Sequence, residues 1–172
     1  MIVTISIAPH DMDVQALVAA ADYVNLMAYD LEGWDGISGY NAPLYHNSKM
    51  RVDMSIDYLF RTHFANLNID KKKLILGFPL YGRKFMTTTP YAPGYQATEV
   101  EYKDLPKNCT RIWDSESQVP YLSCNGFYIS YDDEQSYAAK KLFANTNGLG
   151  GMFFWALGQD AGVITAKVKN IQ

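Results

Sequence analysis

Short apolar runs alternate with amphipathic stretches over most of the chain. Continuous apolar runs are typical of strands that are covered on both faces, as in a parallel sheet. Four such runs occur, at residues 1–8, 23–28, 74–79 and 152–157. Because stretches with helical spacing follow them, the pattern predicts an α/β fold in which helices cover a parallel sheet.

Capping residues indicate where two of the helices begin. After the first strand, apolar residues recur at i, i+3, i+4 and i+7 from Val14, so Asp11 or Asp13 is expected to cap a short helix. Asp53 is expected to cap the next helix. The predicted inner stripe of that helix consists of Ile56, Leu59, Phe60 and His63.

The end of the chain repeats this alternation of helix and strand. Asp132 with Gln135 three positions later resembles a capping box and predicts a helix start. The same helix is expected to end at Asn147-Gly148. A last helix is expected from about residue 162 to the end of the chain.

Residues 84–130 interrupt the alternation. They hold both cysteines, Cys109 and Cys124, and aromatic-rich runs such as residues 126–130, which predicts a small β-rich insertion. The two cysteines are equally compatible with a disulfide in an exported protein and with two free thiols. We therefore divide the chain into residues 1–83, 84–130 and 131–172.

Aromatic and polar residues gather where the predicted parallel strands end, which is where a β/α barrel keeps its active site. These residues are Tyr29, Asp30, Tyr81, Arg83, Trp155 and Asp160. A doubly wound sheet would show a Gly-rich phosphate turn after its first strand, and none is present. A complete barrel needs about 250 residues, so four strands indicate part of one.

Composition narrows the function classes. The 172 residues carry a formal net charge of −3 without a basic cluster, which argues against nucleic-acid binding. No run of about 18 apolar residues predicts a membrane span. Two cysteines and three histidines without ligand spacing predict neither a zinc site nor any other metal, and no cofactor is expected. The 14% aromatic content suits sugar binding and an aromatic core equally well.

Four segments resemble, in the same order, motifs of the family 18 glycoside hydrolases, the chitinases. The segments are residues 25–30 with 33–34 and 41–45, residues 73–83, residues 131–133, and residues 148–155. In the family they belong to the sixth strand, the seventh strand, the end of an α+β insertion and the eighth strand. The resemblance implies a partial (β/α)8 TIM barrel, strands five to eight, with a small α+β chitinase insertion domain.

The resemblance also implies a reaction in which the substrate assists. In this family the 2-acetamido oxygen of the sugar attacks the anomeric carbon of a β-1,4 N-acetylglucosamine linkage while a Glu protonates the leaving oxygen. Tyr29 then carries over as a hydrogen-bond donor to the acetamido oxygen, and Asp30 carries over as a hydrogen-bonding partner near the catalytic centre. Trp155 carries over as the flat floor under the sugar ring.

Further binding residues follow from the same match. Met27 would pack beside the site, and neighbouring subsites would be lined by Trp34, Tyr81 and Arg83. Structural roles stay open beside these: Met27 and Trp155 also suit a core, Asp30 a strand-end cap, and Arg83 an ion pair with the insertion.

One motif of the family is missing from the sequence. The general acid belongs to D-x-x-D-x-D-x-E at the end of the fourth strand, and no such segment occurs here. We therefore expect the C-terminal part of a chitinase that is inactive alone. The alternatives are a non-catalytic, chitin-binding lectin and a half-barrel that associates with itself through exposed sheet edges.

The start of the chain leaves its origin open. Residues 1–8 resemble a strand and not a secretory signal, so Met1 is compatible with a natural start and with a truncation. By resemblance the full-length protein is expected outside the cell, with chitin or N-acetylglucosamine oligomers as its partners.

Overall fold

The structure is a computed structural model that describes residues 1–8, 13–33, 36–93 and 97–168. A parallel four-stranded sheet forms one part of it. The strands lie in the order β1-β2-β3-β9, and each neighbouring pair is parallel. Their bounds are β1 (Thr4–Ile7), β2 (Tyr23–Leu26), β3 (Leu74–Pro79) and β9 (Gly151–Trp155). The predicted parallel sheet of a partial barrel is confirmed.

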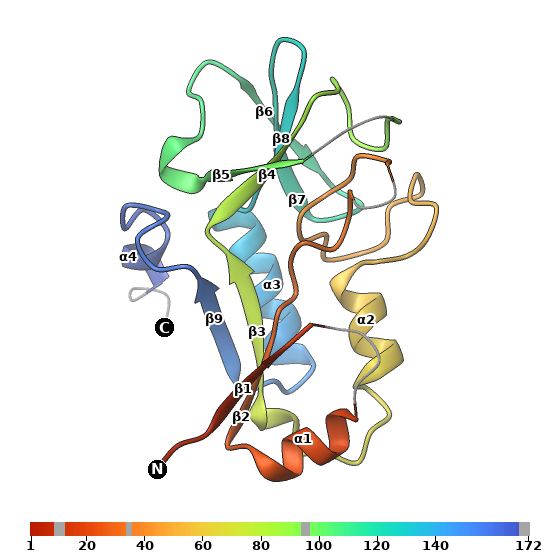
Figure 1. The fold of residues 1–172 in the computed structure, drawn as a ribbon, viewed down its shortest axis with the longest axis vertical. Helices are drawn as coiled ribbons and strands as arrows, with labels where there is room; N and C mark the ends of the chain where they lie inside the picture. The colour runs from red at the N-terminus through yellow and green to blue at the C-terminus, as the bar shows by residue number, and fades with distance from the viewer. Residues whose placement is uncertain (9–12, 34–35, 94–96, 169–172) are drawn as a thin grey trace.

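The register places the carboxyl ends of the parallel strands at one edge. Leu26 lies beside Leu76, and Pro79 lies beside Trp155. In Figure 1 the arrowheads of β3 and β9 point toward the second sheet of the molecule. Residues that follow these strands therefore meet where the two sheets join.

Helices cover one face of the parallel sheet. They are α1 (Val14–Ala20), α2 (Ile56–His63), α3 (Glu134–Thr146) and the short α4 (Thr165–Val168). The buried core joins Leu76 of β3 to Leu59 and Phe60 of α2 and to Phe143 of α3. His63, expected on the inner stripe of α2, is only half-buried. Residues 169–172, the expected end of the last helix, lie outside the described residues.

The two later helix caps differ from expectation by one or two residues. Ser55, not Asp53, caps α2, because its hydroxyl accepts the Tyr58 N–H while Asp53 accepts from Ser55. Asp133, not Asp132, caps α3 in a reciprocal pair with Ser136. For α1 the expected Asp13 is the cap, and Asp11 lies outside the described residues.

Asp132 is instead half of a buried ion pair. Its carboxylate accepts from Lys140 of α3, and both side chains are almost fully buried. Burial raises the pKa of Asp132 and lowers that of Lys140, since each charged form loses its hydration. The Lys140 ammonium also lies 5.3 Å from the centre of the Phe78 ring. The pair holds α3 to the segment after β8, and the Phe78 contact links the same lysine to β3.

The first predicted strand is less buried than expected. Met1 and Ile2 are exposed, and within β1 only Ile7 is buried. The physical reason is that β1 is an edge strand, so its outer side has no neighbour in this chain.

The second sheet is antiparallel and corresponds to the expected β-rich insertion. Its order is β5-β4-β8-β7-β6, and the 3-10 turn η2 (Tyr102–Asp104) follows β5. The strands are β4 (Tyr81–Phe85), β5 (Thr98–Glu101), β6 (Thr110–Asp114), β7 (Val119–Ser123) and β8 (Tyr128–Ser130). β4 starts three residues before the expected boundary at residue 84 and follows β3 almost directly.

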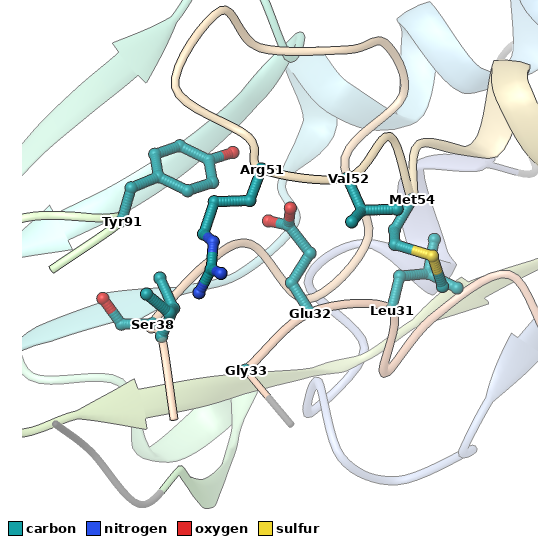
Figure 2. A pocket seen from close by; sticks show the side chains of 9 residues that line it. Leu31, Glu32, Gly33, Ser38, Arg51, Val52, Met54 and Tyr91 are labelled. Carbon is teal, nitrogen blue, oxygen red and sulfur yellow. The ribbon is translucent and has the colours of Figure 1, made fainter. Parts of the chain in front are cut away.

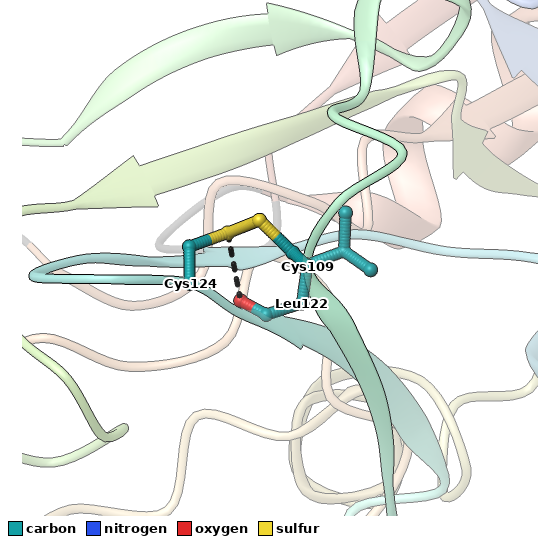
Figure 3. The surroundings of a disulfide bond; sticks show 3 residues. All are labelled: Cys109, Leu122 and Cys124. Atoms are coloured by element: carbon teal, nitrogen blue, oxygen red, sulfur yellow. Dashed lines mark hydrogen bonds between the residues drawn. A yellow bond between two sulfur atoms is a disulfide. The ribbon is translucent and has the colours of Figure 1, made fainter.

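A disulfide joins the adjacent ends of two neighbouring strands of the antiparallel sheet. Cys109 precedes β6 and Cys124 follows β7, with their Cα atoms 4.7 Å apart. Figure 3 shows the bond beside the Leu122 carbonyl, which lies 4.0 Å from the Cys124 Sγ. Of the two alternatives left open by the sequence, the structure has the paired one.

Candidate functional site

Tyr29, Asp30, Tyr81 and Arg83 form a connected group that we call the strand-end cluster. Tyr29 and Asp30 follow β2, whereas Tyr81 and Arg83 belong to β4, which continues from β3. Because β2 and β3 are parallel neighbours, their carboxyl ends bring these side chains together. The sequence predicted the four residues, and the structure places them in mutual contact.

An ion pair links the two halves of the cluster. Nη1 of Arg83 donates to Oδ1 of Asp30 at 3.0 Å. The Arg83 side chain is 12% exposed and that of Asp30 is 38% exposed. The Asp30 carboxylate is therefore held from one side while part of it faces solvent. Arg83 itself lies in β4, so this ion pair joins the antiparallel sheet to the loop after β2, and its partner is not a residue of 84–130 as the structural alternative expected.

Tyr29 is held by aromatic neighbours from two strands. Its ring meets the Tyr81 ring edge-on at 6.1 Å and the Phe153 ring of β9 at 6.4 Å. Burial, together with the charge of Asp30, raises its pKa to about 12. The Tyr29 hydroxyl therefore keeps its proton and can donate a hydrogen bond at any physiological pH.

Tyr81 shares the Asp30 carboxylate with Arg83. Its pKa is raised first by burial, then by the negative charge of Asp30 and by the hydrogen bond that its hydroxyl donates to that carboxylate. The side chain is 2% exposed. Tyr81 thus donates to Asp30 from the buried side of the cluster and does not face solvent.

Trp155 presents the most open ring near this edge of the sheet. It ends β9 and is 53% exposed, and its carbonyl accepts the Leu80 N–H at 2.7 Å. It lies two residues beyond Phe153, so it shares the face of β9 that Tyr29 contacts. A ring with this exposure is available for stacking.

Two further predicted binding residues are Met27 and Trp34. Met27 is half-buried, packs against the main core, and donates its N–H to the Ile7 carbonyl. This placement is compatible with packing and with lining the site. Trp34 lies outside the described residues.

Two residues that sequence reasoning missed determine how the cluster is built. A Cβ on Gly77 of β3 would lie 2.5 Å from the Leu26 carbonyl oxygen and 2.8 Å from the Tyr29 ring, so only glycine leaves room for Tyr29. Asn41 is 0% exposed and its Oδ1 accepts the Asp30 N–H at 3.0 Å. A glycine inside an apolar strand was a usable signal of close approach, whereas nothing local marked Asn41.

Asp160, the acid after β9, hydrogen-bonds the backbone of the loop in which it lies. It is 1% exposed and accepts hydrogen bonds from the N–H groups of Gly162, Ile164 and Thr165. Burial alone would raise its pKa, but these hydrogen bonds outweigh burial and leave the pKa below its ordinary value. Its place in the structure is therefore that of a loop cap.

A cavity of about 280 Å³ opens along the loop that continues from Asp30. In Figure 2 the Arg51 side chain extends between Tyr91 and Glu32, with Leu31 and Met54 at the other end of the pocket. The Glu32 carboxylate also accepts the Tyr40 N–H at 2.6 Å. The lining combines apolar groups with four polar side chains, as in pockets that bind small molecules, and these are Glu32, Ser38, Arg51 and Tyr91.

Within residues 1–8, 13–33, 36–93 and 97–168, no group of three or more His, Cys, Asp or Glu side chains could hold a metal ion. In that part of the chain no helix is both long enough and apolar enough to cross a membrane.

Comparison with known families explains the arrangement. The family model for glycosyl hydrolases family 18 matches residues 1–160. The chain belongs to glycosyl hydrolases family 18. Family 18 membership agrees with the partial barrel and with the position of the strand-end cluster at the carboxyl edge of its sheet.

Two curated relatives show what share of a longer protein this chain covers. The chain is 32% identical to a probable endochitinase of Caenorhabditis elegans, over 86% of this chain and 27% of that protein. An oviduct-specific glycoprotein of Mesocricetus auratus is 28% identical over 86% of this chain and 24% of its own length.

A solved family 18 structure gives the same picture in three dimensions. The chitinase of Cycas revoluta in complex with allosamidin superposes with a TM-score of 0.84 at 26% identity, covering 96% of this chain and 54% of that one. The chain thus spans about a quarter of the curated relatives and about half of the solved domain.

Proposed function

We propose that this chain is the substrate-binding C-terminal part of a chitinase that hydrolyses β-1,4 N-acetylglucosamine linkages by a substrate-assisted, retaining mechanism. One observation carries the proposal. In a chain of family 18, the strand-end cluster places a protonated tyrosine and a held carboxylate at the carboxyl edge of the parallel sheet. In β/α barrels this edge is where substrates bind.

Tyr29 and Asp30 act on the acetamido group. The Tyr29 hydroxyl donates to the acetamido oxygen, which becomes the attacking atom, so the donor holds that oxygen in position for the anomeric carbon. Asp30 keeps a partly exposed carboxylate that can accept from the acetamido N–H while Arg83 fixes its other side. The pKa of about 12 supports this role for Tyr29, since the hydroxyl stays protonated.

The remaining contacts shape the sugar site. Trp155 offers an exposed ring on which the apolar face of a sugar can stack. Met27 packs beside this position, and neighbouring subsites are lined by Trp34, Tyr81 and Arg83. Tyr81 and Arg83 serve chiefly through Asp30, which both of them contact.

The chain alone binds without turnover in this proposal. It contains no D-x-x-D-x-D-x-E segment, so no side chain of that motif can protonate the leaving oxygen. Losing general acid catalysis costs about 10²–10⁴-fold in rate.

The experiment is a titration of the chain with tetra-N-acetylchitotetraose, followed by tryptophan fluorescence, with product analysis of the same samples. We expect a saturable fluorescence change without cleavage. Tyr29→Phe removes one donated hydrogen bond and should weaken binding about 2- to 10-fold. The matched control is Tyr23→Phe, because Tyr23 lies at the opposite end of β2 and is exposed. Equal affinity of all three proteins would refute the role of Tyr29, and rapid cleavage would refute the predicted inactivity.

A second candidate is a chitin-binding lectin that never performs catalysis. The observation that favours it is that the binding groups form a cluster within this chain without the acid. The two candidates separate when a chain that carries the D-x-x-D-x-D-x-E segment is joined to this one. Recovered cleavage supports the chitinase, whereas binding that stays unproductive supports the lectin.

The open edges of the parallel sheet support a further contact. β1 and β9 are edge strands, and Ile2, Val3 and Trp155 expose large apolar surfaces there. Such edges pair readily with other strands, so we infer that the isolated chain associates with itself. Sedimentation at increasing concentration should show dimers or larger species, and a monomer at every concentration would exclude this.

The disulfide supports a location outside the cell. Disulfides such as Cys109–Cys124 persist in oxidising compartments and are rare in the cytosol. Mass spectrometry of the protein from its natural source, alkylated before reduction, should find both cysteines unmodified. Two alkylated thiols would contradict this location.

A further inference from the structure

Asn41 joins the loop after β2 to strands β4 and β8, and all four of its polar groups are used. Its side-chain Oδ1 accepts the Asp30 N–H at 3.0 Å, and its Nδ2 donates to the Tyr81 carbonyl at 3.4 Å. Its backbone N–H donates to Oγ of Ser130 at 2.8 Å, and its carbonyl accepts the Leu31 N–H at 3.0 Å. The residue is 0% exposed, so these contacts replace water completely.

These contacts reach the backbones of Asp30 and Tyr81, two members of the strand-end cluster. Asp30 has a φ of 57°, a left-handed conformation that a non-glycine residue adopts only when its surroundings hold it there. The Asn41 amide and the Asn41 carbonyl hold the N–H groups of Asp30 and of the next residue. Through its Nδ2, Asn41 ties this turn to the backbone of Tyr81, whose side chain hydrogen-bonds Asp30.

We propose that Asn41 is the positioning residue that sets the Asp30 carboxylate against Tyr29 and Tyr81, and thereby gives the site its preference for sugars with a 2-acetamido group. This inference rests on the proposed function. Asn41 touches no substrate atom. It acts through the backbone of Asp30 and Tyr81.

Only an amide satisfies both side-chain contacts. Oδ1 faces an N–H donor and Nδ2 faces a carbonyl acceptor, so the position needs one acceptor and one donor. In Asn41→Asp the second oxygen faces the Tyr81 carbonyl and repels it, while the contact with the Asp30 N–H survives. In Asn41→Ser both contacts are lost.

The test compares two neutral β-1,4 tetramers that differ at C2. Tetra-N-acetylchitotetraose carries the acetamido groups, and cellotetraose carries hydroxyls. We expect the ratio of their dissociation constants to shrink about 2- to 10-fold in Asn41→Asp, which is the range for one well-placed hydrogen bond. In the Asp30→Asn background the same substitution should change the ratio much less, because the carboxylate that Asn41 positions is gone.

Asn47→Asp is the matched control. Asn47 is also buried, lies in the same connection, and donates to Asp114 in the antiparallel sheet instead of contacting Asp30. It should destabilise the chain and leave the ratio unchanged. A ratio that falls equally in Asn47→Asp would show that general loosening, and not positioning, changes the preference.

Amide hydrogen exchange gives a readout that does not depend on sugar. The Asp30 amide should exchange faster in Asn41→Ser, relative to the Leu80 amide, which is held by Trp155. Unchanged exchange at Asp30 would overturn the inference. If the wild-type chain does not prefer the acetylated tetramer, the proposed function fails and this inference falls with it. If the wild type does prefer it and Asn41→Asp keeps the full ratio, only the inference is overturned.

Discussion

Two acidic residues follow parallel strands in this fold, and their surroundings differ. Asp30 follows β2, is paired with Arg83 and keeps a side chain that is 38% exposed. Asp160 follows β9, is 1% exposed, and receives three backbone N–H groups and the Thr165 hydroxyl. The loop after β9 uses its carboxylate to hold itself together, whereas the loop after β2 is held by Asn41 and leaves its carboxylate available.

The difference shows what a strand-end position can and cannot indicate. The position brings an acid to the edge where ligands bind, but the donors around it decide how it is engaged. Asp30 is held by Arg83 and Tyr81 and still keeps a partly exposed side chain, while the Asn41 amide supports its backbone. Substitutions test this comparison, first at Gly77, whose neighbours lie on both β2 and β9.

Gly77→Ala should have the largest effect, because Gly77 adjoins both regions. An added Cβ would lie 2.5 Å from the Leu26 carbonyl oxygen on β2 and 3.0 Å from the Phe153 ring on β9. Overpacking of this kind costs about 1–3 kcal/mol of the free energy of unfolding, and a backbone neighbour places this case at the upper end. Denaturant unfolding measures the loss.

Gly148→Ala is the control for Gly77. Gly148 has a φ of +71° and open space around it, so alanine there meets only backbone strain of about 1 kcal/mol. If Gly148→Ala proved the more destabilising of the two, the close approach at Gly77 would not limit the fold.

The isosteric pair Asp160→Asn and Asp30→Asn tests the comparison directly. In Asp160→Asn the new NH2 group faces N–H donors, so the free energy of unfolding should fall by about 1–3 kcal/mol. Asp30→Asn retains an acceptor for Arg83 at a partly exposed site and should cost less than about 1 kcal/mol. Chemical denaturation of both variants gives the two values, and a larger loss at Asp30 would reverse the assignment of roles.

Acidification should show the smallest effect. Because hydrogen bonds lower the pKa of Asp160 in the folded state, its contribution to stability is present above the unfolded pKa of about 3.9 and is lost as the pH falls through the folded value. The free energy of unfolding should therefore fall less steeply below pH 4 in Asp160→Asn than in the wild type. Parallel slopes for the two proteins between pH 2 and pH 4 would contradict this.

The sequence alone predicted the strands and the residues at their ends. The run at residues 74–79 is β3 as expected, and Tyr29, Asp30, Tyr81 and Arg83 lie together. These features depend on local pattern and on the fact that parallel strands end at one edge. The family resemblance then supplied roles that no spacing could provide.

What could not be predicted depends on contacts between distant segments. The sequence favoured Asp132 as the cap of α3, and only its contact with the buried Lys140 shows that Asp132 pairs inward and leaves the cap to Asp133. Asn41 meets Asp30 and Tyr81 through its side-chain amide, and Ser130, 89 residues away, through its backbone N–H. Residues 1–3 have the pattern of a buried strand, but their exposure follows from the missing neighbour of β1.

The buried Lys140 also offers a chemical readout of local opening. An acylating reagent attacks only an accessible, unprotonated amine, and the Lys140 ammonium lies against Asp132 and the Phe78 ring without exposed surface. Its sequence neighbour Lys141 is half-exposed and reacts in the folded chain. The ratio of label on Lys140 to label on Lys141 therefore reports how often α3 separates from β3 and exposes the buried amine.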